Sequence, residues 1–451
     1  MIFSNRLRAE KNERYILGDA MYDVCIIGGG ASGMACAIAA AGMGLKCIII
    51  EKEAKLGRKI YASGNGRCNI TNHDFDRAYS KYYNSSFPDY EGFLKRLFIK
   101  SSPDKEITDF LFSLGMPTYD IGSYVYPYSL QASSLMWTLT DKIKELKIDT
   151  LLKTCVEKID YIDEAYVIKT KKNDIIHASN VVLACGGAGY ESLGGSKKGY
   201  ELAKALDINC TDIRPSLCGL ITKDDISILS GVRIRARAFL YDDSTKNNAF
   251  KTMYACEEGE LQFTDYGISG IMIFNLSGKA GSLISSQKRA YISLDLLPDI
   301  KDEIIFDVFK KSNYRRPKAV LNNFLNDKLA GYIVDNIEKD IKASCNDIKY
   351  DEQYVKKITE ALHSFNIEIK ALKDFDNAQV TAGGICLDII NPKDMSITNK
   401  NGLYAVGELT DIDGICGGYN LTYAFISGIR AGKGIYDKIK SDKNQRKKTE
   451  Y

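Results

Sequence analysis

The chain has 451 residues, with 61 lysines and arginines against 58 aspartates and glutamates, so its formal net charge is +3. That length allows two or three domains with a large core. The near balance of charge excludes an overall field that would attract nucleic acid or a membrane surface. The twelve cysteines contain no CxxC pair, which predicts reduced, mostly buried thiols in a cytoplasmic protein and no dithiol chemistry.

The first twenty residues are rich in charge and have no apolar segment, so we expect an N-terminal extension rather than a signal peptide. No stretch of the chain reaches the roughly 18 apolar residues that a membrane span needs. Three histidines are too few and too scattered for a metal site. We therefore expect no metal and no membrane partner.

The most informative motif begins at residue 23, where a short apolar strand leads into glycines and a helix of small residues. Gly28 permits the tight turn, Gly30 allows the backbone to approach a pyrophosphate, and Gly33 lets the helix pack closely on the strand. The helix predicted over residues 31–41 would direct its amide groups at the phosphates. This pattern predicts a site for an ADP-containing cofactor.

A second apolar strand, residues 47–50, ends at Glu51. An acid at this distance is expected to hydrogen-bond the adenosine ribose and to repel a 2′-phosphate. The polar, glycine-rich loop of residues 57–72 follows, and its Arg58, Lys59 and Arg67 could reach the pyrophosphate while other groups lie near the flavin N5 and O4 atoms. These two motifs leave FAD and NAD open as the cofactor.

The middle of the chain predicts a helix over residues 134–146 and an antiparallel hairpin over 154–159 and 165–170, followed by a strand over 180–185 that meets Gly186. Residues 206–297 are rich in β patterns. Amphipathic helices are predicted over 304–311, 317–325, 329–341 and 354–365. Residues 378–397 are predicted to return to β structure.

The last motif joins a strand ending at Gly407 and Glu408 to a loop with Gly417 and Gly418 and then a helix predicted over residues 422–433. In flavoproteins such an acid lies on the ribityl hydroxyls. The helix amino end stabilises the negative charge of a reduced flavin near N1 and O2. Two distant binding motifs favour the long FAD molecule over NAD.

The predicted fold is α/β, a Rossmann-type FAD-binding domain with an inserted β-rich, barrel-like domain and a small helical insert. The predicted segments are 1–20 (extension), 21–205 (FAD-binding, first part), 206–297 (β-rich), 298–370 (helical insert), 371–440 (return and FAD-binding, second part) and 441–451 (basic tail). The predicted cofactor-binding residues are Gly28, Gly30, Ala31, Ser32, Gly33, Glu51, Lys52, Arg58, Lys59, Asn65, Gly66, Arg67, Cys68, Val156, Gly186, Gly407, Glu408, Gly417, Gly418, Asn420 and Leu421.

Three runs, GRKIxxSGNGRCNxTN from residue 57, GELQFTDYGISG from residue 259 and GLYxxGExxDxxGxxGGYNLxxAxxSGxxAG from residue 402, resemble the bacterial HI0933-like flavoproteins. That family includes enzymes described as aminoacetone oxidases and 3-dehydro-bile-acid Δ4,6-reductases. The resemblance covers nearly all of residues 21–439, and it implies a discontinuous FAD domain, a barrel-like domain and a helical insert. The sequence departs from the family pattern at residues 189–200, Asp265 and Ile271, which bears on substrate identity.

We expect a FAD-dependent oxidoreductase with non-covalent FAD and hydride transfer through flavin N5. The favoured activity is NAD(P)H-dependent reduction of a conjugated C=C bond in a ketone-like small molecule. NAD(P)H would bind transiently, since the sequence has no second GxGxxG. The alternatives are an amine oxidase that uses O₂ and a flavin-dependent protein that modifies or binds RNA, although the charge pattern predicts no nucleic-acid partner.

The motifs identify no catalytic acid or base. Cys68 is expected to serve packing rather than redox chemistry, because it has no resolving partner nearby in the sequence. Tyr126 and Tyr128 are candidates for lining the substrate cleft, or else structural aromatics.

Overall fold

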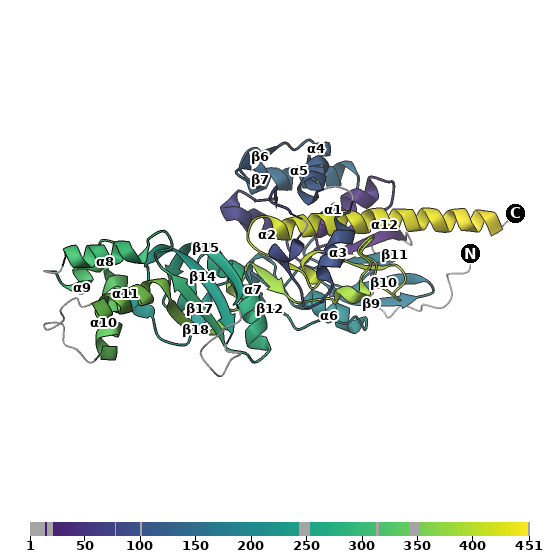
Figure 1. Ribbon diagram of the computed structural model, residues 1–451. Helices are drawn as coiled ribbons and strands as arrows, with labels where there is room; N and C mark the ends of the chain where they lie inside the picture. Colours follow the sequence, from purple (N-terminus) through teal and green to yellow (C-terminus); the bar gives the residue numbers. More distant parts are fainter. Residues whose placement is uncertain are drawn as a thin grey trace. The chain divides into compact units, whose positions relative to one another are not determined.

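The computed structural model describes residues 14–15, 21–76, 78–99, 102–242, 253–312, 315–341 and 352–449 (Figure 1). Among them the chain forms two compact units, one containing residues up to Arg214 and from Val380 on, the other Pro215–Gln379. The first unit is therefore built from two separate stretches of chain. The finer segment limits given above stay a prediction, and all of the N-terminal extension except Arg14–Tyr15 lies outside the described residues.

A mostly parallel sheet forms the centre of the first unit. Its neighbours in order are β8 (Asp149–Leu151), β3 (Cys47–Ile50), β2 (Tyr22–Ile27), β11 (Asp174–Leu183), β10 (Ala165–Thr170) and β9 (Val156–Ile162), and both β1 (Arg14–Tyr15) and β20 (Leu403–Ala405) also pair with β11. All four residues of β3 are buried, as expected of a parallel strand covered on both faces. The predicted antiparallel hairpin of β9 and β10 is confirmed.

Helices and small sheets surround this sheet. The helices are α1 (Ala31–Ala41), α2 (Arg58–Ala62), α3 (Tyr90–Leu97), α4 (Pro103–Ser113), α5 (Ala132–Glu145), α6 (Lys198–Ala205) and α12 (Tyr419–Thr449). The small sheets are β4 (Thr71–Asn72) with β7 (Tyr124–Pro127) and β6 (Thr118–Ile121), and β5 (Tyr83–Asn84) with β21 (Asp413–Gly414). The helices predicted over 134–146 and 422–433 are confirmed, the second as part of the much longer α12.

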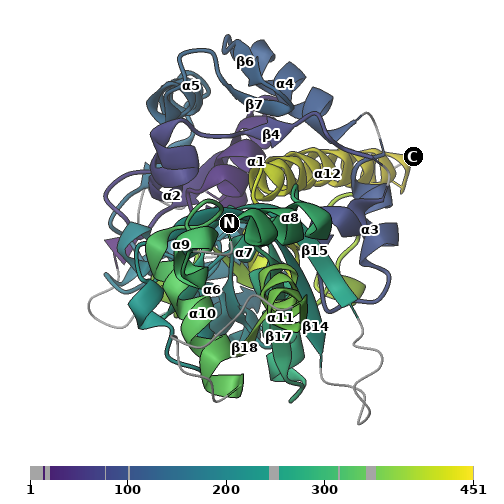
Figure 2. The same cartoon turned by 60° about the vertical axis from the view of Figure 1, so that its left-hand side comes forward.

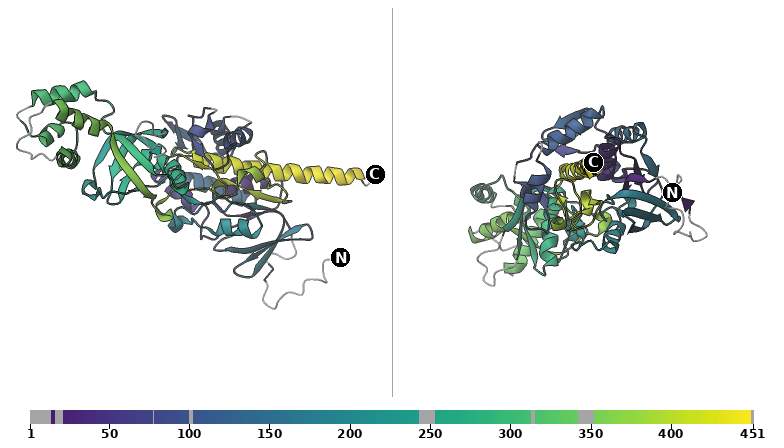
Figure 3. Two further views of the ribbon diagram at one scale, coloured as in Figure 1. Left: turned by 60° about the horizontal axis from the view of Figure 1, so that its bottom comes forward. Right: turned by 90° about the vertical axis from the view of Figure 1, so that its right-hand side faces the viewer.

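Helices α1 and α12 pack against each other in the same direction through glycines. A Cβ added at Gly428 would lie 2.2 Å from the carbonyl oxygen of Ser32, and one added at Gly432 would lie 2.6 Å from that of Cys36. Both contacts are with backbone, which cannot move aside. The last turns of α12 extend past the sheet, and residues 441–445 are exposed, as predicted for the basic tail (Figure 3).

We expect Gly428→Ala to lower the free energy of unfolding by about 1–3 kcal/mol, because the added methyl group overpacks the contact with Ser32. The matched control is Gly331→Ala in α10 (Asp327–Ile341), where the added carbon meets only the flexible side chain of Lys318 at 3.4 Å. This control should gain up to about 1 kcal/mol from helix propensity. Calorimetric unfolding of both variants tests the prediction, and a Gly428→Ala protein as stable as the parent would contradict it.

The second unit contains a closed barrel of β13 (Leu220–Thr222), β16 (Gly267–Ser269), β15 (Met253–Phe263), β14 (Arg233–Asp242), β17 (Ala290–Asp295) and β18 (Phe365–Leu372). Helices α8 (Asp302–Lys311), α9 (Pro317–Leu321), α10 and α11 (Glu352–His363) lie between β17 and β18 in the sequence (Figure 2). The apolar residues of the barrel and of these helices form one core. The β-rich, barrel-like prediction and the helical insert are both confirmed.

Two sequence expectations about secondary structure are wrong. Helix α7 (Ile271–Ser285) lies inside the stretch predicted to be β-rich. Its Asn275, Lys279 and Ser282 recur at helical spacing, a polar stripe that the β patterns on both sides of the segment obscure. Residues 378–397 contain one strand, β19 (Val380–Ala382), followed by isolated β-bridges and a 3-10 turn over Leu387–Ile389, because Gly383 and Gly384 with φ of +83° and +143° turn the chain away from an extended path.

Of the eleven cysteines in the described residues, five are buried, while Cys210 and Cys256 are exposed. The sequence predicts a larger buried share. Within the described residues no helix combines the length and apolar character that crossing a bilayer requires. Nor does that part of the chain hold a group of three or more histidine, cysteine or acidic residues suited to a metal ion.

Candidate flavin-binding site

The first glycine loop has two glycines packed against protein and one open to space. A Cβ added at Gly28, whose φ is +111°, would lie 2.3 Å from the carbonyl oxygen of Ala184, and one added at Gly33 would lie 2.0 Å from that of Gly28. At Gly30 an added Cβ would meet nothing within 4 Å. The loop therefore leaves free backbone where the sequence predicts a pyrophosphate, which fits an ADP-containing cofactor.

Glu51 follows β3 and faces the same loop. Its Oε2 accepts a hydrogen bond of 2.7 Å from the amide of Gly29, and its Oε1 accepts one of 2.8 Å from the amide of Glu53. Each carboxylate oxygen keeps a further lone pair. Glu51 thus supports the glycine loop, and its expected bond to a ribose remains a prediction.

The C-terminal motif lies directly beside the first loop. A Cβ at Gly407 would lie 2.6 Å from the hydroxyl oxygen of Ser32 in α1. The amide of Gly407 donates to the hydroxyl of Ser427 in α12 at 3.0 Å. The two motifs that the sequence assigns to one cofactor are therefore in contact.

The two helices begin at different heights along their shared direction. Residue 428 of α12 lies beside residue 32 of α1, so α12 begins eight residues earlier relative to this contact than α1 does. At 1.5 Å per residue the two amino ends are offset by about 12 Å. The amino end of α1 therefore lies where the pyrophosphate is predicted. The amino end of α12 lies further along, where the flavin pyrimidine of the same extended molecule is predicted.

The loop of residues 57–72 joins this arrangement through side chains. Lys59 Nζ forms an ion pair of 2.8 Å with Glu408 Oε2. The side-chain amide of Asn72 donates to the carbonyl of Gly417 at 3.2 Å, and the hydroxyl of Thr422 donates to that of Thr71 at 2.7 Å. Three separate segments of sequence therefore meet at one place.

The remaining predicted residues lie around the same loops or have partners of their own. Arg58 pairs with Glu53 and donates to the carbonyl of Ser192 at 2.9 Å. Val156 is buried at the start of β9, close to Glu51 because the amide of Thr154 donates to the carbonyl of Glu51 at 2.9 Å. The other predicted residues lie in the first glycine loop and α1 (Ala31, Ser32), after Glu51 (Lys52), in the loop of residues 57–72 (Asn65, Gly66, Arg67), after β11 (Gly186) and at the start of α12 (Gly418, Asn420, Leu421).

Cys68 lies in the loop of residues 57–72 with a positive φ of +59° and a fully buried side chain. Burial raises the pKa of its thiol to about 11. The thiol is therefore protonated at neutral pH. This agrees with the expectation that Cys68 serves packing rather than redox chemistry.

Two residues of this region have no predicted role: Thr381 lies outside the sequence motifs, and Ser427 stands in the C-terminal run without a partner assigned to it. Thr381 in β19 accepts at its hydroxyl from the amides of Ala188 and Gly189, and its own amide donates to Glu408 Oε1 at 3.0 Å. Ser427 holds Gly407, as described above. The only sequence signal is the glycine pair that follows Thr381, and it does not specify a partner.

His73 links the loop of residues 57–72 to two acids on other elements. Its Nδ1 lies 2.7 Å from Asp104 in α4, and its Nε2 lies 3.2 Å from Asp120 in β6. The hydrogen bond to Asp104 raises the pKa of the imidazole, and Asp120 adds to this against partial burial. His73 directly follows Asn72, whose side-chain amide contacts Gly417.

Because the pKa is raised in the folded state, this pairing stabilises the protein fully below the unfolded value of about 6.5 and less as the pH rises through the folded pKa. The His73 side chain is 41% exposed, so after solvent screening we expect a contribution of only about 0.5 kcal/mol. His73→Gln should remove that part of the stability difference between pH 6 and pH 8 in urea unfolding, whereas His177→Gln should not. Equal pH dependence of His73→Gln and the parent would contradict the prediction.

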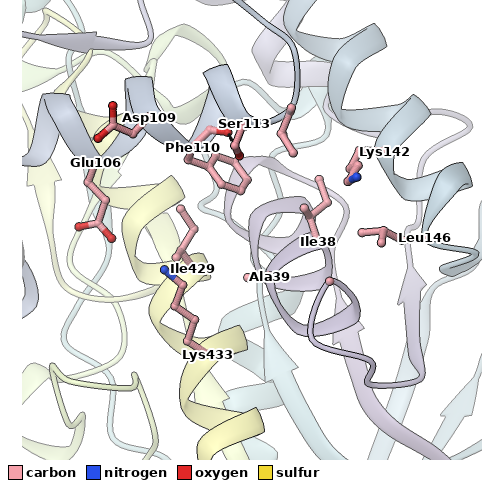
Figure 4. A pocket seen from close by; sticks show the side chains of 12 residues that line it. Ile38, Ala39, Glu106, Asp109, Phe110, Ser113, Lys142, Leu146, Ile429 and Lys433 are labelled. Atoms are coloured by element: carbon pink, nitrogen blue, oxygen red, sulfur yellow. Dashed lines mark hydrogen bonds between the residues drawn. The ribbon is translucent and has the colours of Figure 1, made fainter.

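A cavity of about 590 Å³ lies elsewhere on the first unit, between α1, α4, α5 and α12 (Figure 4). It is lined by Ile38 and Ala39 near the carboxyl end of α1, with Glu106 and Phe110 of α4 and Ile429 of α12. None of its lining residues belongs to the predicted cofactor set. The cavity is therefore at the other end of α1 from the glycine loop and is not the flavin site.

The parallel sheet, the glycine loop and the joined C-terminal motif define a Rossmann-type dinucleotide-binding enzyme. The chain matches the family described as HI0933-like protein Rossmann domain over residues 22–434. It is 32% identical over 422 residues to the 3-dehydro-bile acid delta(4,6)-reductase of Clostridium scindens, covering 92% of this chain and 98% of that protein. The chain belongs to the HI0933-like family and is a FAD-dependent oxidoreductase.

Two further relatives are named ribosomal RNA dihydrouridine synthase. The protein of Haemophilus influenzae is 26% identical over 416 residues, covering 89% of this chain and 95% of the relative. The protein of Escherichia coli is 24% identical over 429 residues, covering 90% and 96%. The exclusion of nucleic-acid partners, which follows from net charge alone, has no support from these relatives.

Proposed function

We propose that the chain uses non-covalent FAD and NAD(P)H to reduce a C=C bond conjugated to a carbonyl group in a small, apolar ketone. The observation that carries this proposal is the pair of parallel helix amino ends, offset by about 12 Å, beside the open backbone of Gly30. A relative named for bile-acid reduction supports the bond type. The double bond that a dihydrouridine synthase reduces is likewise conjugated to a carbonyl.

When bound, FAD would supply a hydride from N5 to the carbon β to the carbonyl, while a proton reaches the α carbon. The protein's part is binding and electrostatics. Glu51 would hold the ribose, and Glu408, already fixed by Lys59 and the amide of Thr381, would hold the ribityl chain. The amino end of α12 would stabilise negative charge on the flavin pyrimidine.

Anaerobic spectroscopy tests the proposal. NADH or NADPH should bleach the flavin band of the purified protein, and 4-androstene-3,17-dione, a conjugated ketone, should restore it with loss of its C=C bond. Bleaching by aminoacetone but not by NAD(P)H would favour the amine oxidase instead. Failure of both nicotinamides to reduce the flavin would overturn the proposal.

RNA modification is a second candidate, favoured by the two relatives named for it. Reduction of unmodified ribosomal RNA by the holoenzyme with NADPH would then yield dihydrouridine, detected by nucleoside mass spectrometry. Dihydrouridine formation without reduction of the ketone would place this chain with those relatives.

A further inference from the structure

One face of the hairpin formed by β6 and β7 exposes a group of apolar side chains. Tyr119 pairs with Tyr126 and Ile121 pairs with Tyr124 across the two strands, so these four side chains share a face. Tyr119, Ile121 and Tyr124 are 46%, 40% and 44% exposed. Tyr128, at 64% exposure, packs edge-on against Tyr119 with ring centroids 5.7 Å apart. We call these five residues the tyrosine face.

On the opposite face of the same hairpin, the residues of β7 are packed against the protein, while Asp120 of β6 is exposed. Val125 and Pro127 point to that side, and both are buried. Hairpin stability therefore does not require apolar residues on the tyrosine face. An apolar group of this kind on a surface indicates a binding site.

The tyrosine face is continuous with the segments predicted to hold the flavin. Asn72 of β4 pairs with Tyr124 and donates its side-chain amide to Gly417. Burial and Tyr124 raise the pKa of Tyr126, and the guanidinium of Arg67 opposes that rise, so the charge of Arg67 acts on this tyrosine. Arg67 belongs to the loop predicted to approach flavin N5. A molecule lying on this face would therefore extend from the expected reaction centre.

We propose that the tyrosine face binds the body of the substrate, and that this substrate is a flat molecule of several fused apolar rings with its conjugated ketone toward the flavin. This inference rests on the proposed function. Each of the two strands is four residues long, so the face extends about 10–13 Å along them, which a single-ring ketone cannot cover. Its five side chains carry no charge, whereas an RNA strand is held by several cations along its phosphates.

Equilibrium binding of ketones to the oxidised holoenzyme tests this inference without any reductant. Binding is measured by the flavin difference spectrum and by calorimetry. We expect 4-androstene-3,17-dione to bind at least about 100-fold more tightly than 2-cyclohexen-1-one, because it buries much more apolar surface. Tyr119→Ser and Tyr124→Ser should each lower the affinity for the polycyclic ketone about tenfold and change the affinity for the small ketone little. The FAD content should stay that of the parent protein.

The control is Tyr161→Ser, a tyrosine of equal exposure, 46%, on β9 at the edge of the large sheet. It should leave both affinities unchanged. Equal affinity of the two ketones, or equal loss in Tyr161→Ser, would overturn the inference. It would also be overturned if the Tyr119 and Tyr124 variants lost only affinity for a uracil-containing oligoribonucleotide, or only self-association in sedimentation. Face-dependent ketone binding without any C=C reduction would refute the proposed function and leave this binding site standing.

Discussion

Gly30→Trp is expected to yield a folded but colourless protein, with affinity for FAD lowered at least about 100-fold. Gly30 has an ordinary φ of −79° and no atom within 4 Å of an added Cβ. A side chain at this position therefore starts in open space, and we expect the indole to fill the space predicted for the pyrophosphate. Flavin absorbance per protein, together with circular dichroism to verify folding, is the measurement.

Two comparisons make this result specific. Gly331→Trp, in α10 of the other unit, adds the same side chain where only Lys318 is near, and it should stay yellow. Gly28→Ala places a Cβ 2.3 Å from a backbone oxygen and should lose stability as well as flavin. A yellow Gly30→Trp protein would remove the basis for placing the cofactor at this loop.

Local patterns predicted most of the fold because they reflect local physics. The buried strands β2 and β3 appear as apolar runs, and the hairpin of β9 and β10 shows alternation. The helix α7 was missed because β patterns lie on both sides of it, although its own Asn275, Lys279 and Ser282 recur at helical spacing.

The same distinction applies to the site. Glycines at Gly28, Gly33 and Gly407 are predictable because each removes a clash with backbone or a neighbouring side chain. Thr381 and Ser427 could not be predicted, because a single hydroxyl has no spacing rule and its partners are distant in sequence. The contact between Gly407 and Ser32 depends on the packing of α12 along α1, a long-range property of the fold.

Arg430 is another residue that the sequence did not indicate. It is 3% exposed in α12, and its Nε donates to the carbonyl of Leu97 at 3.0 Å. Its two Nη atoms bind both oxygens of Glu106 in α4. This bidentate pair between Arg430 and Glu106 holds α12 against α4. It thereby also helps to position the amino end of α12, which belongs to the predicted flavin site.

We expect Arg430→Met to lower the free energy of unfolding by about 3–5 kcal/mol, because it leaves the Glu106 carboxylate largely buried without a partner. Arg430→Met combined with Glu106→Leu should recover most of that loss, since no charge then remains buried. Urea unfolding of the two variants gives both values. If the double variant were no more stable than Arg430→Met, packing of the arginine stem rather than charge pairing would hold α12 in place. Retention of flavin would then depend on the shape of the side chain at position 430 and not on its charge.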